Sequence, residues 1–197
     1  MKINDIIAKF GKYQGMTRRS ATKFIFSLIR NKEKIRDLEE MLNLINKNVC
    51  LCEKCGNIAF ETVCEICQNA KREHSTVCIV EDFEDITNLE KGLWYNGIYH
   101  VLGGLLSAQK GMMPDALNTK PLFQRIQDGE VTEIIFASTS SFEWRATMYY
   151  LTEEIKKIPN GEKISITEFA HGLPIGSSFE YMDEGTLQIA YQTRRAI

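Results

Sequence analysis

Two Cys-x-x-Cys pairs lie close together in this chain of 197 residues, and they constrain its fold more than any other feature. Cys52 and Cys55 form the first pair, and Cys64 and Cys67 form the second after a gap of eight residues. A two-residue gap lets both thiolates of a pair face one metal ion from a tight turn. Four sulfurs fill the tetrahedral sphere of Zn²⁺, so the spacing predicts one structural zinc per chain, with no open position for catalysis.

The alternatives for these cysteines are two disulfides or separate core thiols. Disulfides require an oxidising compartment. The first residues carry no apolar segment of the signal-peptide kind, and no apolar run reaches the roughly 20 residues of a membrane span. We therefore expect a cytoplasmic, nucleoid-associated protein without a membrane partner. Cys50 lies too close to Cys52 to join the metal site, and Cys78 lies in an apolar run that predicts burial.

The charges are divided unevenly along the chain. Residues 1–50 contain 11 Lys and Arg against 5 Asp and Glu, a net charge of +6, whereas residues 51–197 carry a net charge of −8. A basic end on an acidic body indicates a surface for a polyanion. The alternative is an ordinary solvated helical surface. A hydrophobic content of 44% excludes a disordered chain.

Apolar residues at helical spacing predict helices at residues 3–10, from Thr17 onward, and at residues 32–46. In the last of these we expect four residues to be buried: Ile35, Leu38, Leu42 and Ile45.

The first two of these helices are joined by a glycine-bearing turn. Such a hairpin leaves free N–H groups at the start of its second helix, where Arg18, Arg19 and Lys23 lie. This arrangement favours contacts with DNA phosphates without readout of bases. The alternative is a helical pair that only packs on its neighbour.

After residue 76 the pattern changes to alternating strands and helices. Short apolar runs predict strands at residues 77–80, 98–102, 133–137 and 163–167. Helices are expected to begin near Asp85, at Pro114 (reaching Gln127) and at Phe142 (reaching Lys157), with a last helix near Asp183. This alternation predicts an α/β fold with a parallel sheet. The polar stretch from Gln68 to Ser75 is expected to be a connector.

Two carboxylates lie where functional groups gather in parallel sheets, at the carboxyl ends of strands. Glu81 follows the first predicted strand, and Glu143 starts the helix after the third. Converging carboxylates can hold Mg²⁺ for phosphoryl transfer, but polar residues are also common at loop–helix junctions. His100 lies in an apolar strand and is expected to be a core histidine, whereas His171 lies in a Gly/Pro-rich loop and is the better functional candidate.

Several short motifs follow one another over nearly the whole chain: Ser20-Ala21, the four-cysteine motif, Cys78-Ile-Val-Glu81, Tyr99-His-Val-Leu-Gly-Gly104, Gly172-Leu-Pro-Ile-Gly176 and Glu180-Tyr181. In these motifs and in their order, the chain resembles the RecR family of recombination mediators. The resemblance implies a helix-hairpin-helix DNA-binding region, a four-cysteine zinc finger, a Toprim domain and a C-terminal oligomerisation tail. The corresponding ranges are 1–50, 51–70, 76–170 and 171–197.

The same resemblance implies a function without catalysis. The chain would be a DNA-binding adaptor or clamp in recombinational DNA repair, a ring-shaped homotetramer that helps RecO and RecF load RecA on gapped or single-stranded DNA. Arg19 and Lys23 match basic family positions that face DNA. The alternative is a Toprim-type nuclease or another metal-dependent phosphoryl-transfer enzyme, and a third possibility is a zinc-ribbon interaction module without a nucleic-acid role.

Two segments depart from the family pattern. Gly15-Met16-Thr17 stands where the family usually has Gly-x-Gly, and we expect Thr17 to cap the helix instead. Glu143-Trp144-Arg145 stands where the Toprim segment usually reads Glu-Gly-Glu. The Arg145 guanidinium adds positive charge where a cation would bind, so we expect weak or absent Mg²⁺ binding there. Trp144 either stacks on a base or is buried in a contact.

Overall fold

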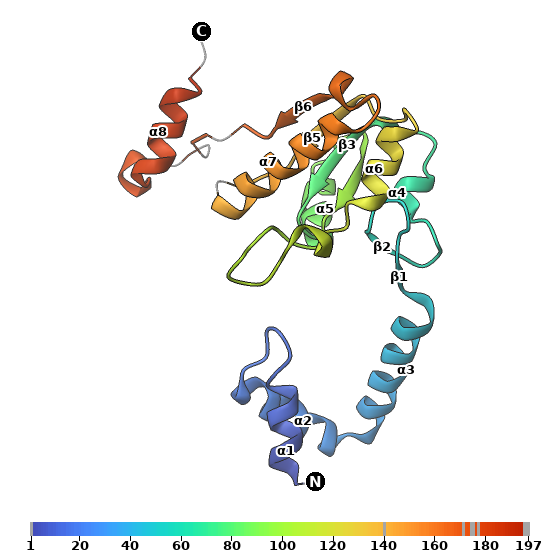
Figure 1. Ribbon diagram of the computed structural model, residues 1–197. Helices are drawn as coiled ribbons and strands as arrows, with labels where there is room; N and C mark the ends of the chain where they lie inside the picture. The colour runs from blue at the N-terminus through green and yellow to red at the C-terminus, as the bar shows by residue number, and fades with distance from the viewer. Residues whose placement is uncertain (1, 140, 171, 174–175, 177, 195–197) are drawn as a thin grey trace. The chain divides into compact units, whose positions relative to one another are not determined.

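The computed structural model describes residues 2–139, 141–170, 172–173, 176 and 178–194 (Figure 1). The chain divides into two units, Met1–Val49 and Cys50–Ile197. Among the described helices, none combines the length and the apolar character that crossing a bilayer requires.

The N-terminal unit contains three helices, as predicted: α1 (Ile3–Phe10), α2 (Arg18–Arg30) and α3 (Lys32–Asn48). Ile7 of α1 packs with Ala21 and Ile25 of α2, and these three residues form the small core of the unit. Period-3.6 spacing places them on facing stripes of the two helices.

Thr17 is the N-cap of α2, as predicted. Its Oγ1 accepts a hydrogen bond from the N–H of Ser20 at 3.2 Å, and the Ser20 Oγ accepts one from the Thr17 N–H at 2.9 Å. This reciprocal pair satisfies two N–H groups at the helix start. Gly15 supplies the positive φ, 76°, that the preceding turn needs.

The burial expected in α3 is wrong. No residue of this helix is buried; Leu42 and Ile45 are each 56% exposed, and Ile35 and Leu38 are only half-buried. Helical spacing identifies an apolar face but does not say what covers it.

The second unit begins with the four-cysteine segment. A short antiparallel hairpin, β1 (Cys50–Leu51) and β2 (Ile58–Ala59), precedes the one-turn helix α4 (Glu65–Gln68). The sequence pattern does not predict this hairpin, because its strands are only two residues long and show no alternation of apolar and polar residues.

A four-stranded sheet follows, and all its strands are parallel, as predicted. Its strands are β3 (Glu73–Val80), β4 (Gly97–Val101), β5 (Glu133–Phe136) and β6 (Ser165–Glu168), in the spatial order β4-β3-β5-β6.

Two strands begin two or more residues away from their predicted starts, and the other strand boundaries differ from the prediction by at most one residue. β3 begins at Glu73, inside the expected connector, because its polar residues also pair: Glu73 lies opposite Gly97, and Thr76 opposite Glu133. β6 starts two residues later than expected, because a 3₁₀ turn occupies Gly161–Lys163.

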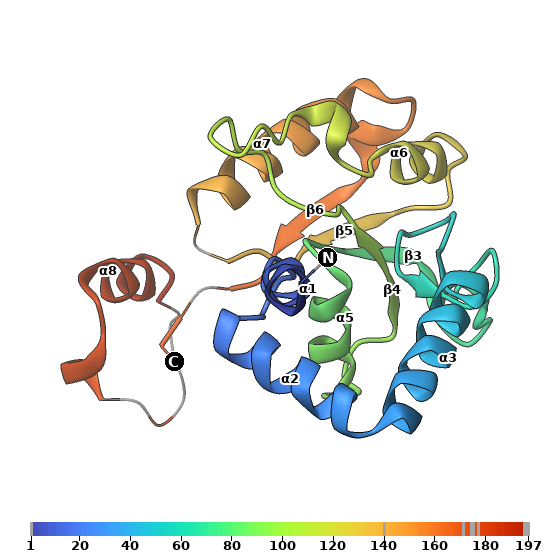
Figure 2. The same cartoon turned by 90° about the horizontal axis from the view of Figure 1, so that it is seen from below.

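Helices cover both faces of the sheet: α5 (Phe83–Glu90) lies on one side, and α6 (Lys120–Gln127) and α7 (Phe142–Lys157) lie on the other (Figure 2). Side chains of β3 alternate between these layers. Val77 and Ile79 pack with α6 and α7, whereas Cys78 and Val80 pack with α5, and the predicted burial of Cys78 is confirmed.

The expectation of one helix from Pro114 to Gln127 is wrong. Pro114–Ala116 is an isolated 3₁₀ turn, and α6 begins anew at Lys120 with Pro121 in its first turn. Proline lacks the N–H that a continuous helix would need at that position, but it is tolerated at a helix start. The last helix, α8 (Glu184–Gln192), begins near Asp183 as predicted, and Asp183 is its N-cap.

Candidate functional site

The four cysteines of the motif converge on one point. Their sulfur atoms all lie within 4.8 Å of one another, and each side chain is at most 5% exposed. The Sγ atoms of Cys55 and Cys64 are 3.6 Å apart. Ideal tetrahedral geometry with Zn–S bonds of about 2.3 Å requires sulfurs about 3.8 Å apart, so the four residues fit a metal ion.

Both alternatives for these residues are wrong in this structure. All six cysteines are free thiols, and the 3.6 Å between Cys55 and Cys64 is far from the disulfide length of about 2.05 Å. Convergence of four sulfurs also distinguishes them from separate core thiols such as Cys78.

Local hydrogen bonds shape the first half of the motif. The Cys52 N–H donates to the Asn57 carbonyl, and the Gly56 N–H donates to the Cys52 carbonyl, both at 2.8 Å. Gly56 has a φ of 75°, a left-handed conformation that glycine adopts readily at the end of such a turn. The Cys64 N–H donates to the Cys52 sulfur at 3.3 Å, which joins the two Cys-x-x-Cys halves.

The motif is docked on the edge of the sheet. The Val101 N–H of β4, an outer strand, donates to the Cys55 carbonyl at 2.7 Å, and the Asn118 side-chain amide donates to the Val101 carbonyl at 3.0 Å. A Cβ added at Gly56 would lie 2.4 Å from that amide nitrogen, so only glycine fits. The motif thus covers an edge that would otherwise expose unpaired backbone groups.

Electrostatics within the cluster follow from shared thiol protons. Hydrogen bonding with Cys55 lowers the pKa of the Cys64 thiol, and the same contact raises the pKa of Cys55. A bound metal ion takes the place of these protons, because only thiolates coordinate it.

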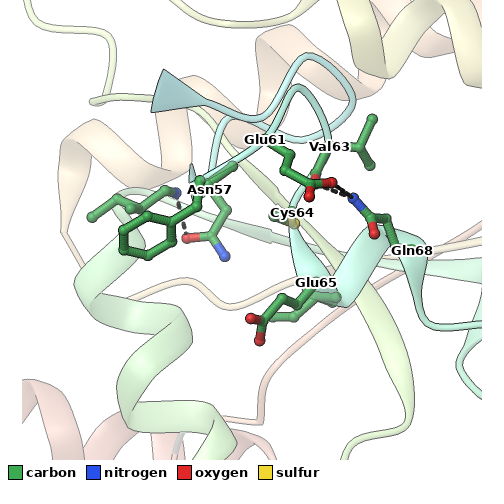
Figure 3. A pocket seen from close by; sticks show the side chains of 10 residues that line it. Asn57, Glu61, Val63, Cys64, Glu65 and Gln68 are labelled. Atoms are coloured by element: carbon green, nitrogen blue, oxygen red, sulfur yellow. Dashed lines mark hydrogen bonds between the residues drawn. The ribbon is translucent and has the colours of Figure 1, made fainter. Parts of the chain in front are cut away.

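Beside the motif lies an open pocket of about 470 Å³, lined by residues from Asn57 to Gln68 (Figure 3). The Asn57 side chain accepts the Ile58 N–H at 2.8 Å, and the Gln68 amide donates to the Val63 carbonyl at 2.6 Å. The polar groups of Asn57 and Gln68 therefore hold the loop in shape.

The three basic residues predicted to bind DNA lie together at the start of α2. Arg18, Arg19 and Lys23 are all exposed, and within the described part of the chain none of them forms an ion pair. The first turn of α2 contains no acidic residue. The guanidinium charges therefore add to the positive end of the helix dipole, and the resulting field attracts anions.

Glu81 and Glu143, the two carboxylates singled out as a possible Mg²⁺ site, do not form a tight cluster like that of the four cysteines. Burial raises the pKa of Glu81, with Asp85 adding to the effect and Glu143 contributing less. Among the described residues, the cysteine quartet is the only group of three or more acidic, histidine or cysteine side chains close enough to share a metal ion. Arg145 is exposed. It lines a pocket with Ser138 and Glu168, and neither Glu81 nor Glu143 lines this pocket.

Trp144 and His100 both belong to the core. Trp144 is 1% exposed and packs in the layer of α6 and α7, so the base-stacking alternative is wrong. His100 is fully buried, as expected, and burial lowers its pKa to about 3. His171 lies outside the described residues.

Two residues near the metal site were not identified from the sequence: Asn118 and Arg125. Arg125 is 8% exposed, and it interrupts the apolar stripe of α6 between Leu122 and Ile126. A charged residue next to buried positions of a helix is the signal that could have revealed it.

Comparison with known proteins agrees with this architecture. The Toprim domain model matches residues 75–168, and the model of the RecR C-terminal region matches residues 172–195. A protein named Recombination protein RecR from Tropheryma whipplei (strain Twist) is 37% identical over 99% of this chain and 97% of its own length. Proteins of the same name from Ehrlichia chaffeensis and Neorickettsia sennetsu are 37% and 36% identical, over 100% of this chain and 100% and 98% of their own lengths. The chain therefore belongs to the RecR family.

Proposed function

We propose that this chain is a DNA-binding adaptor of recombinational DNA repair and not an enzyme. The observation that carries the proposal is similarity along the entire chain to proteins named Recombination protein RecR. Following the family resemblance, it would act with RecO- and RecF-like proteins to load a RecA-like recombinase on gapped or single-stranded DNA.

The start of α2 is the proposed DNA-binding surface. Arg18, Arg19 and Lys23 are exposed cations without ion-pair partners among the described residues, beside the free N–H groups of a helix start. This surface suits phosphate oxygens and offers no specific base readout. Binding is therefore expected to be independent of sequence and strongly dependent on salt.

The four-cysteine site is proposed to hold one Zn²⁺ per chain. Four sulfur ligands favour this ion among the common divalent metals, and they leave no open coordination position. The metal would therefore stabilise the fold of residues 50–68 and its docking on β4, without performing chemistry.

Helix α3 is proposed to mediate self-association into the ring-shaped homotetramer that the resemblance implies. Ile35, Leu38, Leu42, Ile45 and Val49 recur at alternating intervals of three and four residues, which is the seam of a coiled coil. Leu42 and Ile45 are each 56% exposed within one chain. A helix from a second copy would cover this face.

The alternative of a Toprim nuclease has one supporting observation, the raised pKa of Glu81, since shifted carboxylates are common in active sites. Against it, Arg145 replaces the second carboxylate of the family segment. We therefore propose that Mg²⁺ binds weakly at Glu81 and Glu143 and that no cleavage depends on it.

The double substitution Arg19→Ala/Lys23→Ala is expected to weaken DNA binding, because it removes two phosphate contacts. The slope of log affinity against log salt concentration should become shallower by about 1 to 2. Fluorescence anisotropy with single-stranded and gapped DNA at several salt concentrations measures both effects.

The matched control for this experiment is Lys156→Ala/Lys157→Ala, which removes the same charge from α7, where these lysines pair with Glu153 and Glu154. This control should bind DNA like wild type. Equal affinity for all three proteins would contradict the proposed surface.

Mg²⁺-dependent DNA cleavage that Glu81→Gln abolishes would support the nuclease alternative.

Cys64→Ser is expected to lose the metal, because three thiolates hold it far less tightly than four. Elemental analysis should find about one zinc per wild-type chain and much less in the variant. The melting temperature should fall, since metal binding contributes on the order of several kcal/mol to folding of such sites. Cys50→Ser is the control: Cys50 is an exposed thiol that bonds to the Ala59 and Glu61 carbonyls outside the cluster. Freshly purified wild type without zinc would refute the site.

Leu42→Gln/Ile45→Gln is expected to reduce the oligomer to smaller species, because it places amides in the apolar seam. Light scattering coupled to size-exclusion chromatography measures the mass. Glu39→Gln/Glu40→Gln, on the same helix but outside the seam, should leave the mass unchanged. A monomeric wild type, or an unchanged mass in the Leu42/Ile45 variant, would exclude α3 as the interface.

A further inference from the structure

Arg125 is a buried cation that the proposed function does not use. Its side chain is 8% exposed, and its Nε and Nη1 atoms are buried without a hydrogen-bond partner in the described part of the chain. Burial of an unpaired guanidinium destabilises the fold, because the charge loses its hydration. A compensating group must therefore lie nearby, or the residue would be replaced by an apolar one of similar length.

The one hydrogen bond formed by the guanidinium does not compensate its charge. Arg125 Nη2 donates to His100 Nδ1 at 3.1 Å. The His100 ring is neutral, since burial and the neighbouring Arg125 lower its pKa to about 3. Its Nε2–H is then left to donate to the Asn118 carbonyl. This chain of contacts orients the guanidinium but brings no negative charge to it.

Contacts connect Arg125 to the four-cysteine segment: it bonds to His100, His100 bonds to the Asn118 carbonyl, and the Asn118 side chain lies against Gly56. Among the described residues Arg125 forms no ion pair with a carboxylate. Burial lowers the pKa of Arg125, whereas Cys67, Cys55 and Cys52 favour its charged form, and Glu130 adds to their effect. A divalent ion with four thiolates carries a net charge of −2, so the bound site is itself a buried anion.

We propose that Arg125 is the counter-charge of the metal–thiolate centre and that His100 positions it. The proposal rests on the proposed zinc site. The guanidinium offsets part of the −2 charge by electrostatic attraction through a region of low dielectric, without a direct hydrogen bond to the sulfurs. Groups just outside the ligand sphere commonly tune metal affinity.

The proposal also explains why the motif and the sheet meet at this place. Arg125 comes from α6 and His100 from β4, whereas the ligands come from the segment before β3. Metal binding would then stabilise packing between segments that are distant in sequence. A purely structural arginine would act only through its aliphatic stem, and methionine could replace that stem.

The test compares Arg125→Met, Arg125→Lys and the control Leu122→Ala. Met removes the charge and keeps the stem, Lys keeps the charge, and Leu122→Ala opens a cavity one turn away, at a residue that is fully buried. Zinc affinity is measured on the full chain by competition with a chromogenic chelator. Arg125→Met should bind zinc about 10- to 100-fold more weakly than wild type. Arg125→Lys should recover much of the affinity, and Leu122→Ala should lower the melting temperature without lowering the affinity.

Co²⁺ substitution supplies a second readout that a structural role would not change. A positive charge near the sulfurs lowers the energy of their lone pairs. The sulfur-to-cobalt charge-transfer band should therefore move to longer wavelength in Arg125→Met, and it should stay in place in Leu122→Ala. An unchanged affinity and band in Arg125→Met would overturn the proposal, as would an equal loss of affinity in both variants.

If Arg125→Met does not fold, Cys67→His provides the comparison, because it lowers the charge of the site from −2 to −1. Arg125→Met should then fold and bind zinc in the Cys67→His background, and failure there would count against the counter-charge role. Wild type that binds neither Zn²⁺ nor Co²⁺ would instead refute the metal site itself, which separates the two failures.

Discussion

The hydrogen bond from the Val101 amide to the Cys55 carbonyl is the contact on which the second unit depends. It joins the four-cysteine segment to the outer strand of the parallel sheet, and the close approach at Gly56 fixes the distance between them. The hairpin β1–β2 is too short to be stable alone. The shape of the hairpin therefore depends on the cysteine cluster, and its position depends on β4. The hairpin segment in turn covers the outer edge of β4.

This arrangement separates the stabilising part of the second unit from the DNA-binding surface proposed in the first. The four sulfurs are buried and leave no open coordination position, so the proposed metal would contribute folding free energy and no reactivity. The proposed DNA contacts are exposed cations on a helix start, where affinity comes from phosphates and depends on salt. Arg145 adds positive charge to the Toprim segment, and Trp144 fills the core there. Both features favour the proposed adaptor role over the nuclease alternative.

The sequence predicted most elements but not their surroundings. The four ligands follow from spacing alone, and the order of strands and helices follows from hydrophobic periodicity and from residues such as Thr17 and Asp183 that begin helices. Coverage of α3 could not be predicted, because an apolar face has the same periodicity whether a neighbour covers it or not. β3 extends into a polar stretch because central pairing also stabilises Glu73 and Thr76. The proposed role of Arg125 at the metal site could not be predicted, since only the tertiary fold brings α6 next to His100 and the four-cysteine segment.

Hydrogen–deuterium exchange before and after metal removal by a chelator tests the central claim most directly. The account predicts that amide protection falls in residues 50–68, at Val101 and in α6, because the cluster holds the docked segment on the sheet edge. Protection in α1 and α2 should not change, since their core of Ile7, Ala21 and Ile25 is independent of the metal. Unchanged protection in residues 50–68 after complete metal removal would contradict the account.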